Sequence, residues 1–193
     1  PDIDWSRINA FHMDEYVGLD PSHPAGFRNF LRRAIFDHKP FKSVHLLNGN
    51  AEDSWAEADR YHTLLAEHPL DVCILGIGEN GHIAFNDPPV ADFNDKKFVK
   101  VVELDQVCRM QQVHDGCFAS IDQVPTHALS ATIPGLCAAK YMFCSVPAST
   151  KALAVKHTVE DAVSTACPAT ILKEQLHACL YTDKDAGQYL LDK

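Results

Sequence analysis

The sequence alternates short apolar runs, each bounded by turn-forming residues, with longer segments of helical hydrophobic period. This alternation is typical of βα units, whose strands form a mostly parallel sheet with helices on both faces. We therefore predict a doubly wound α/β fold, a Rossmann-like sandwich. The expected strands span residues 8–13, 71–76, 97–103, 140–146 and 177–182, and the expected helices span residues 25–37, 51–67, 104–113 and 149–159, with a last turn or two after Asp183.

The length of the chain favours a single domain. Its 193 residues, 46% of them apolar, are enough for one sizeable core and too few for two comfortable ones. No repeat, low-complexity tract or linker interrupts the pattern. We predict one domain over residues 1–193. Because the chain starts at Pro1 and soon enters an apolar run at Ile8, we expect this domain to be incomplete at its N-terminus and to lack its first βα unit.

Charge and cysteine content exclude several classes of protein. The net charge of −9 has no basic run to offset it, so no nucleic-acid partner is expected, and an anionic substrate needs a local basic group. No run of roughly 18 apolar residues and no signal peptide occurs, so we predict a cytoplasmic protein without a membrane partner. The seven cysteines lack a Cys-x-x-Cys pair, which predicts reduced thiols and no metal.

A glycine-rich segment follows the expected strand 71–76. Residues 76–81, Gly-Ile-Gly-Glu-Asn-Gly, fit the pattern G-x-G-x-x-G of dinucleotide-binding loops. That motif requires a helix to begin within the loop, so that its N-terminus meets the pyrophosphate. Here Pro88 and Pro89 follow and prevent such a helix from continuing. We therefore expect no nicotinamide cofactor, and we predict no cofactor of any other kind.

Polar side chains follow three of the expected strands, where open α/β sheets bind their ligands. These places are Asp14 with Glu15, residues 76–87, and residues 149–151. In the second of them His82 stands among carboxylates and amides, which suits a general acid or base. Each place also has a purely structural interpretation: Asp14 and Glu15 can be turn or cap residues, and Lys151 can be a solvated helix residue.

Several motifs together resemble one enzyme family. They are Phe-His-Met-Asp-Glu-Tyr-Val-Gly-Leu at 11–19, Leu-Leu-Asn-Gly-Asn at 46–50, Gly-Ile-Gly-Glu-Asn-Gly-His-Ile-Ala-Phe-Asn-Asp-Pro at 76–88, Gln-Val-Pro at 123–125, Ala-Leu-Ser at 128–130 and Ser-Thr-Lys-Ala-Leu-Ala at 149–154. In this order and approximate spacing they resemble the glucosamine-6-phosphate deaminase (isomerase) family over nearly the whole chain. The resemblance implies a doubly wound α/β fold and conversion of glucosamine-6-phosphate to fructose-6-phosphate and ammonia in amino-sugar catabolism.

The resemblance also implies roles for individual residues. Asp14 matches the aspartate that moves a proton between C2 and C1 of the open-chain sugar phosphate, and His82 matches the histidine that opens the ring. Asp87 stands where the family usually has a glutamate that supports this histidine. Lys151 matches the lysine that contacts the substrate phosphate. The other residues expected at the substrate are Glu15, Gly81 and Arg109.

Three departures from the family pattern concern the same site. Asn80 replaces an aspartate, so a neutral amide stands where a carboxylate usually polarises the histidine; Glu79 or Asp87 can compensate. The Ser/Gly/Thr-rich loop that cradles the phosphate, upstream of the first strand, is missing from the sequence. The family's lid arginine is out of register, which leaves Arg109 as a substitute or as a surface residue of its helix.

Three alternatives remain open at this stage. The substrate can be galactosamine-6-phosphate, or the enzyme can be a hydrolase similar to 6-phosphogluconolactonase, which shares the fold. Outside enzymes, the chain can be a sugar-phosphate sensor domain, since Asn80 leaves loss of catalysis possible. A homo-oligomer is an additional possibility for any of these functions.

Overall fold

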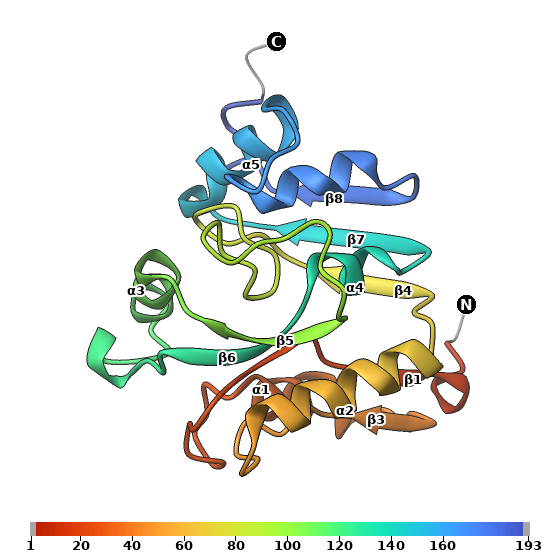
Figure 1. Ribbon diagram of the computed structural model, residues 1–193. Helices are drawn as coiled ribbons and strands as arrows, with labels where there is room; N and C mark the ends of the chain where they lie inside the picture. Colours follow the sequence, from red (N-terminus) through yellow and green to blue (C-terminus); the bar gives the residue numbers. More distant parts are fainter. Residues whose placement is uncertain (1–2, 191–193) are drawn as a thin grey trace.

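The computed structural model describes residues 3–190 and confirms the mixed α/β class (Figure 1). Its strands form three sheets, two of them parallel and one antiparallel. One parallel sheet contains β1 (Asn9–Phe11) and β3 (Ser43–His45), and the other contains β4 (Val72–Leu75), β7 (Tyr141–Val146) and β8 (Ala178–Thr182). The antiparallel sheet has the order β2 (Asp14–Tyr16), β6 (His127–Ala131) and β5 (Val99–Glu103).

Helices form at the four expected places, with shifted ends. The α-helices are α1 (Phe27–Leu31), α2 (Ser54–Glu67), α3 (Gln106–His114), α4 (Ile133–Cys137) and α5 (Ala152–Glu160). Shorter or irregular helical turns are η1 (Trp5–Arg7), η2 (Arg32–Phe36), η3 (Ile121–Gln123), η4 (Ser149–Lys151) and η5 (Pro168–Glu174). Helix α2 begins later than expected because the Asp53 carboxylate accepts hydrogen bonds from the N–H groups of Trp55 and Ala56 and caps it there. Residues 183–190 form turns only.

The five expected strands are confirmed, but three others escaped the prediction. Strands β2 and β3 have three residues each, fewer than a period of two needs to become visible. Strand β6 is buried on both faces, so its residues do not alternate between polar and apolar. The expected strand 97–103 corresponds to β5, which pairs antiparallel with β6 and does not join the parallel sheets.

The core of the larger parallel sheet lies on one of its faces. Inward residues such as Leu75 and Met142 pack against α4, α5 and η5. The opposite face exposes apolar residues that alternate with them along β4 and β7, among them Ile74 at 72% exposure. Within residues 3–190, therefore, the helices that pack on this sheet through its core lie on its inward face.

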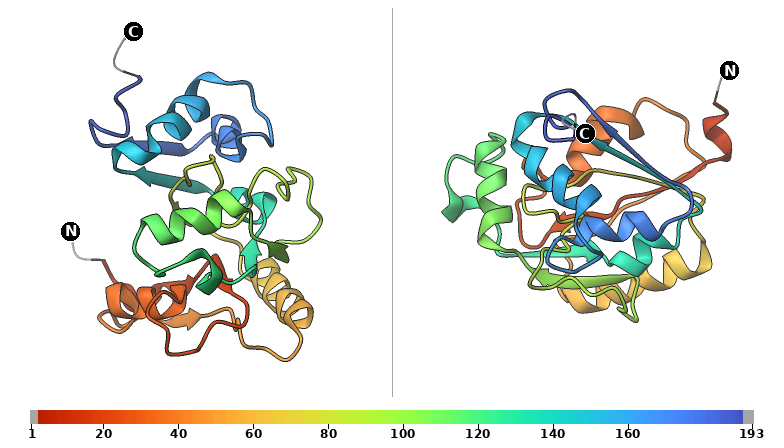
Figure 2. Two further views of the ribbon diagram at one scale, coloured as in Figure 1. Left: turned by 90° about the vertical axis from the view of Figure 1, so that its left-hand side faces the viewer. Right: turned by 90° about the horizontal axis from the view of Figure 1, so that it is seen from above.

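The carboxyl ends of the parallel strands face α3. The arrow of β7 points to the side on which α3 lies (Figure 1), and β4 and β8 run parallel to β7. In the left view of Figure 2, α3 faces the viewer between the β7 and β8 strands above and α1 with α2 below. The loops after the strands thus gather next to α3, as expected for a site in an α/β protein. No helix within residues 3–190 is long and apolar enough to cross a membrane.

Tyr61 connects α2 to the first parallel sheet. Its side chain is buried, and its hydroxyl donates to the His45 carbonyl at 2.8 Å and accepts from the His12 N–H at 3.0 Å. The phenol therefore satisfies backbone groups at the ends of two strands that precede α2 in the chain.

We expect Tyr61→Phe to lower the free energy of unfolding by about 1 to 3 kcal/mol, because it leaves buried backbone groups without a partner. Urea unfolding measures the effect. Tyr181→Phe is the control, since Tyr181 is 54% exposed. Equal stability of the two variants would contradict the role of the Tyr61 hydroxyl.

Candidate active site

Strand β6 brings two predicted site segments together. Ser130 lies opposite Asp14 in the antiparallel pairing of β2 with β6. The Ser130 hydroxyl accepts a hydrogen bond from the Phe85 N–H at 3.0 Å, and the buried Asn86 side chain donates to the next carbonyl of β6 at 2.8 Å. Two consecutive residues of β6 thus hold Asp14 beside the loop of residues 82–87.

His82 is held by a carboxylate and an amide. Its Nδ1 lies 2.9 Å from Oδ1 of Asp87 and 2.7 Å from Oδ1 of Asn80, and the Asn80 amide donates to the same Asp87 oxygen at 3.0 Å. Asp87 therefore supplies the negative charge that the Asn80 substitution removes. Glu79 does not compensate, because its carboxylate faces His114 at 3.9 Å. This network assigns the proton of neutral His82 to Nδ1, so Nε2 is the nitrogen that can exchange a proton with a ligand.

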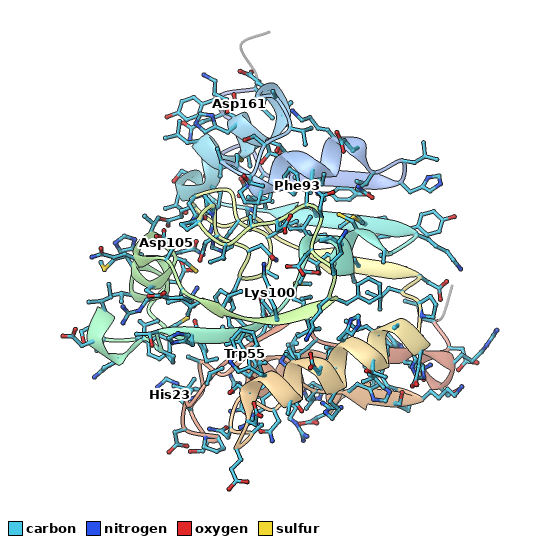
Figure 3. The ribbon with its side chains drawn as sticks, in the orientation of Figure 1. His23, Trp55, Phe93, Lys100, Asp105 and Asp161 are labelled. Carbon is cyan, nitrogen blue, oxygen red and sulfur yellow. The ribbon has the colours of Figure 1, made fainter. Side chains whose placement is uncertain are left out.

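Asp87 is fully buried and surrounded by hydrogen-bond donors. Its second oxygen accepts from the N–H of Asp105, which is labelled in Figure 3 at the start of α3, at 3.2 Å. The Cys108 thiol also lies within hydrogen-bonding reach. Burial alone raises the pKa of Asp87, but its hydrogen bonds to His82, Asn80 and the Asp105 N–H, with the charge of His82, bring that pKa below its usual value. Asp87 is therefore an anion at neutral pH.

The glycines of the segment serve the packing of His82. A Cβ on Gly78 would lie 2.0 Å from the His82 ring, so the ring rests directly on the backbone. Gly81 has a φ of +82°, which favours glycine, and a Cβ there would lie 2.5 Å from the sulfur of Cys167. Residues 76–90, all of them described, form turns and no helix. Glycines of the G-x-G-x-x-G pattern are thus required here because the His82 ring packs on Gly78 and the backbone turns at Gly81, and not because a dinucleotide binds.

Asp14 has the most perturbed carboxyl group of the site. Burial, and secondarily the negative charge of Glu15, raises the pKa of Asp14 from 3.8 to about 7. The residue as a whole remains partly exposed, so a small molecule can reach it. A carboxyl group with a pKa near neutrality can both accept and return a proton, which is what a proton shuttle between neighbouring carbons requires.

Lys151 is a half-buried cation at the same site. It ends η4, and its ammonium forms no hydrogen bond or ion pair with any residue between 3 and 190. Burial lowers its pKa, and the charges of Asp115, Glu79 and Cys108 act in the opposite direction. These groups belong to the glycine-rich segment and to the region of α3, so Lys151 lies within electrostatic range of the loops that hold His82. An unpaired, partly desolvated ammonium suits a phosphate ligand.

Glu15 has a structural role in this arrangement. Its buried carboxylate accepts hydrogen bonds from the N–H groups of Tyr16, Phe27 and Arg28 at 2.9 to 3.2 Å, and so caps α1. These bonds occupy both of its oxygens. We therefore do not assign Glu15 to the substrate, although the sequence predicted it there.

Arg109 also serves the fold. Its guanidinium donates to the carbonyls of Ile121 and Val124, both at 2.8 Å, and so fixes the turn that leads into β6. It lines a groove of about 490 Å³ between residues 17–20 and 122–127, which contains none of the predicted catalytic residues. The structure thus separates Arg109 from the His82 network.

Two residues of the site escaped the sequence prediction. Cys108 is 1% exposed, and burial together with the charges of Asp87 and Asp14 raises the pKa of its thiol. In the sequence it is one apolar position of a helix, which carries no functional signal. Ser130 belongs to a motif that we recognised, but its role as the bridge between Asp14 and the His82 loop depends on the pairing of β6.

Comparison with known proteins identifies close relatives. The chain is 36% identical to a glucosamine-6-phosphate deaminase of Lactobacillus delbrueckii subsp. bulgaricus, over 97% of the chain and 78% of the relative. It is 38% identical to a glucosamine-6-phosphate deaminase of Bacillus thuringiensis, over 95% of the chain and 68% of the relative.

Solved structures agree with this relationship. A monomeric glucosamine-6-phosphate deaminase superimposes with a TM-score of 0.86 at 31% identity, over 94% of this chain and 74% of that one. A 6-phosphogluconolactonase of Thermotoga maritima, at a TM-score of 0.68 and 17% identity, over 94% and 75%, shares the fold. The model of the glucosamine-6-phosphate isomerase/6-phosphogluconolactonase family matches residues 1–180, and the chain belongs to that family.

Proposed function

We propose that this protein converts glucosamine-6-phosphate and water to fructose-6-phosphate and ammonia. The observation that carries the proposal is the pairing of His82 with the buried Asp87 anion, next to an Asp14 whose pKa is about 7. Its relatives at 36 to 38% identity are deaminases of this substrate. Neither a metal nor a cofactor enters the proposal, because a carboxylate and a histidine suffice for the proton transfers.

Asp14 is the base of the isomerisation. As a carboxylate it removes the proton from C2 of the open-chain amino sugar, and it returns this proton to C1. The transfer converts the amino aldehyde into the imine of a ketose, which water hydrolyses with release of ammonia. With a pKa near 7, Asp14 is populated both as the carboxylate and as the carboxylic acid at neutral pH, so it can take up a proton and give it back.

His82 prepares the substrate for this step. Its Nε2 gives a proton to the ring oxygen and so opens the pyranose, while Asp87 stabilises the imidazolium form from the side of Nδ1. Asn80 orients both partners, since it accepts from His82 and donates to Asp87. In this assignment the neutral Asn80 is compatible with catalysis, because the charge comes from Asp87.

Two further predictions of the sequence remain proposals. Lys151 binds the phosphate, and Gly81 lines the substrate pocket beside His82. The structural relative with the TM-score of 0.86 is a monomer, so the fold does not require a homo-oligomer for activity. A cytoplasmic location accords with a phosphorylated substrate.

The first test is an ammonia-release assay with glucosamine-6-phosphate, galactosamine-6-phosphate and 6-phosphogluconolactone. We expect ammonia from glucosamine-6-phosphate, and we expect Asp14→Asn to lower kcat by about 10²- to 10⁴-fold without loss of substrate binding. Ammonia from galactosamine-6-phosphate alone would show that this epimer, and not glucosamine-6-phosphate, is the substrate. Hydrolysis of the lactone without ammonia would make the enzyme a lactonase, and binding without turnover would make it a sensor.

Asp14→Asn should also stabilise the protein in a pH-dependent way. Because the folded-state pKa of Asp14 lies above the unfolded value, ionisation costs stability as the pH rises from 3.8 to about 7. At pH 8 we expect the variant to be more stable than the wild type by about 1 to 3 kcal/mol, and near pH 4 the difference should vanish. Denaturant titrations at both pH values measure it, with exposed Asp122→Asn as the control. If Asp14→Asn were less stable than the wild type at pH 8, the raised pKa of Asp14 would be disproved.

Lys151→Met tests the phosphate contact. We expect kcat/KM for glucosamine-6-phosphate to fall by about 10- to 100-fold, the loss of a charge-assisted hydrogen bond, mainly through KM. Lys156→Met, on the same helical segment, is the matched control. Unphosphorylated glucosamine should be processed equally poorly by Lys151→Met and the wild type. An unchanged KM for the phosphorylated substrate would leave Lys151 without this role.

A further inference from the structure

Three side chains that can bind metals meet within the candidate active site. His82, Asp87 and Cys108 each offer one ligand atom, and these atoms lie within 4.8 Å of one another. The exposed fractions of the three residues are 8%, 0% and 1%. His82 and Asp87 belong to the loop of residues 82–87, and Cys108 belongs to α3. The fold alone creates this cluster of nitrogen, oxygen and sulfur.

This combination of ligands favours zinc over magnesium or calcium. Zinc binds imidazole nitrogen, carboxylate oxygen and thiolate sulfur at about 2.0 to 2.3 Å, whereas the hard cations select oxygen alone. Around such a centre the ligand atoms lie closer than about 4 Å to one another, so the three side chains have to draw together when the cation binds. A bound cation would displace the proton of the buried Cys108 thiol. The resulting thiolate and the Asp87 carboxylate would then neutralise the two charges of the cation inside the protein.

We propose that His82, Asp87 and Cys108 form an inhibitory site for zinc or another thiophilic divalent cation. The site is distinct from a cofactor site, because without metal its groups are already satisfied by the 2.9 Å contact between His82 and Asp87. Occupancy is therefore a competition between the cation and this hydrogen bond. The inhibitory effect rests on the proposed function, whereas the binding itself does not.

Coordination would remove the acid function of His82. The cation takes Nδ1, so the proton now on Nδ1 moves to Nε2, and the thiol proton of Cys108 leaves to solvent. An imidazole with a metal on one nitrogen cannot carry protons on both. It can then no longer alternate between the neutral and cationic forms that ring opening uses. Asp87 is engaged by the same cation and is lost as the partner of His82.

Three protein ligands leave one position of a four-coordinate cation for water. His82 retains 10% side-chain exposure, whereas Asp87 and Cys108 are buried. Three protein ligands with one open position are the coordination of accessible zinc sites.

Two measurements test the site. In the first, zinc inhibition is titrated for the wild type and Cys108→Ser, each relative to its own uninhibited rate. We expect the zinc concentration for half inhibition to rise by at least about tenfold in Cys108→Ser, since a ligand is lost. Cys117→Ser is the matched control, because this cysteine follows α3 and is exposed. An equal shift in Cys117→Ser, or no shift in Cys108→Ser, would overturn the proposal.

The second measurement does not depend on activity. Cobalt(II) is added to the metal-free wild type, and the near-ultraviolet band of thiolate-to-cobalt charge transfer is recorded. We expect the band in the wild type and in Cys117→Ser, and its loss in Cys108→Ser and Cys108→Ala. A band that survives in both Cys108 variants would assign the metal to another cysteine and overturn the proposal. If the cobalt band follows Cys108 but the enzyme releases no ammonia, the metal site stands and the proposed function fails.

Discussion

The buried carboxylate of Asp87 is the interaction on which the rest of the site depends. A fully buried anion is costly unless donors surround it. Here the donors come from the glycine-rich segment, through His82 and Asn80, and from the start of α3, through the Asp105 N–H. The need to satisfy this one charge therefore fixes the loop after β4 against α3 and sets the orientation of His82 at the same time.

Strand β6 completes this frame from the other side. It pairs with β2, which carries Asp14, and its Ser130 hydroxyl accepts from the loop that ends at Asp87. A slip of one residue in this antiparallel pairing would move Asp14 to the opposite face of the sheet. The relative position of base and histidine is thus a property of strand register, held by backbone pairing more than by contacts between the two side chains themselves.

The sequence predicted much of the fold because five strands and four helices carry a clear period, as β7 and α2 do. It could not predict the antiparallel sheet, since β2 is too short and β6 is buried on both faces. For the site, the motifs located Asp14, His82 and Lys151, but Glu15 and Arg109 carry the same kind of signal and serve the backbone. Only three-dimensional contacts separate a carboxylate that caps a helix from one that faces a substrate.

The two aspartates of the site illustrate how environment divides the chemistry. Asp87 receives several donors, and its pKa falls in spite of full burial; Asp14 lacks such donors and lies beside Glu15, so its pKa rises to about 7. Two identical side chains are therefore a permanent anion and a reversible base at the same pH. A hydrogen-bond donor at Asp14 would stabilise its carboxylate and so lower its proton affinity. The high proton affinity that suits Asp14 for its proposed role as a base therefore comes from the free energy that its ionisation costs in the folded protein. The hydrogen bonds around Asp87 hold the neighbouring loop in place in spite of this cost.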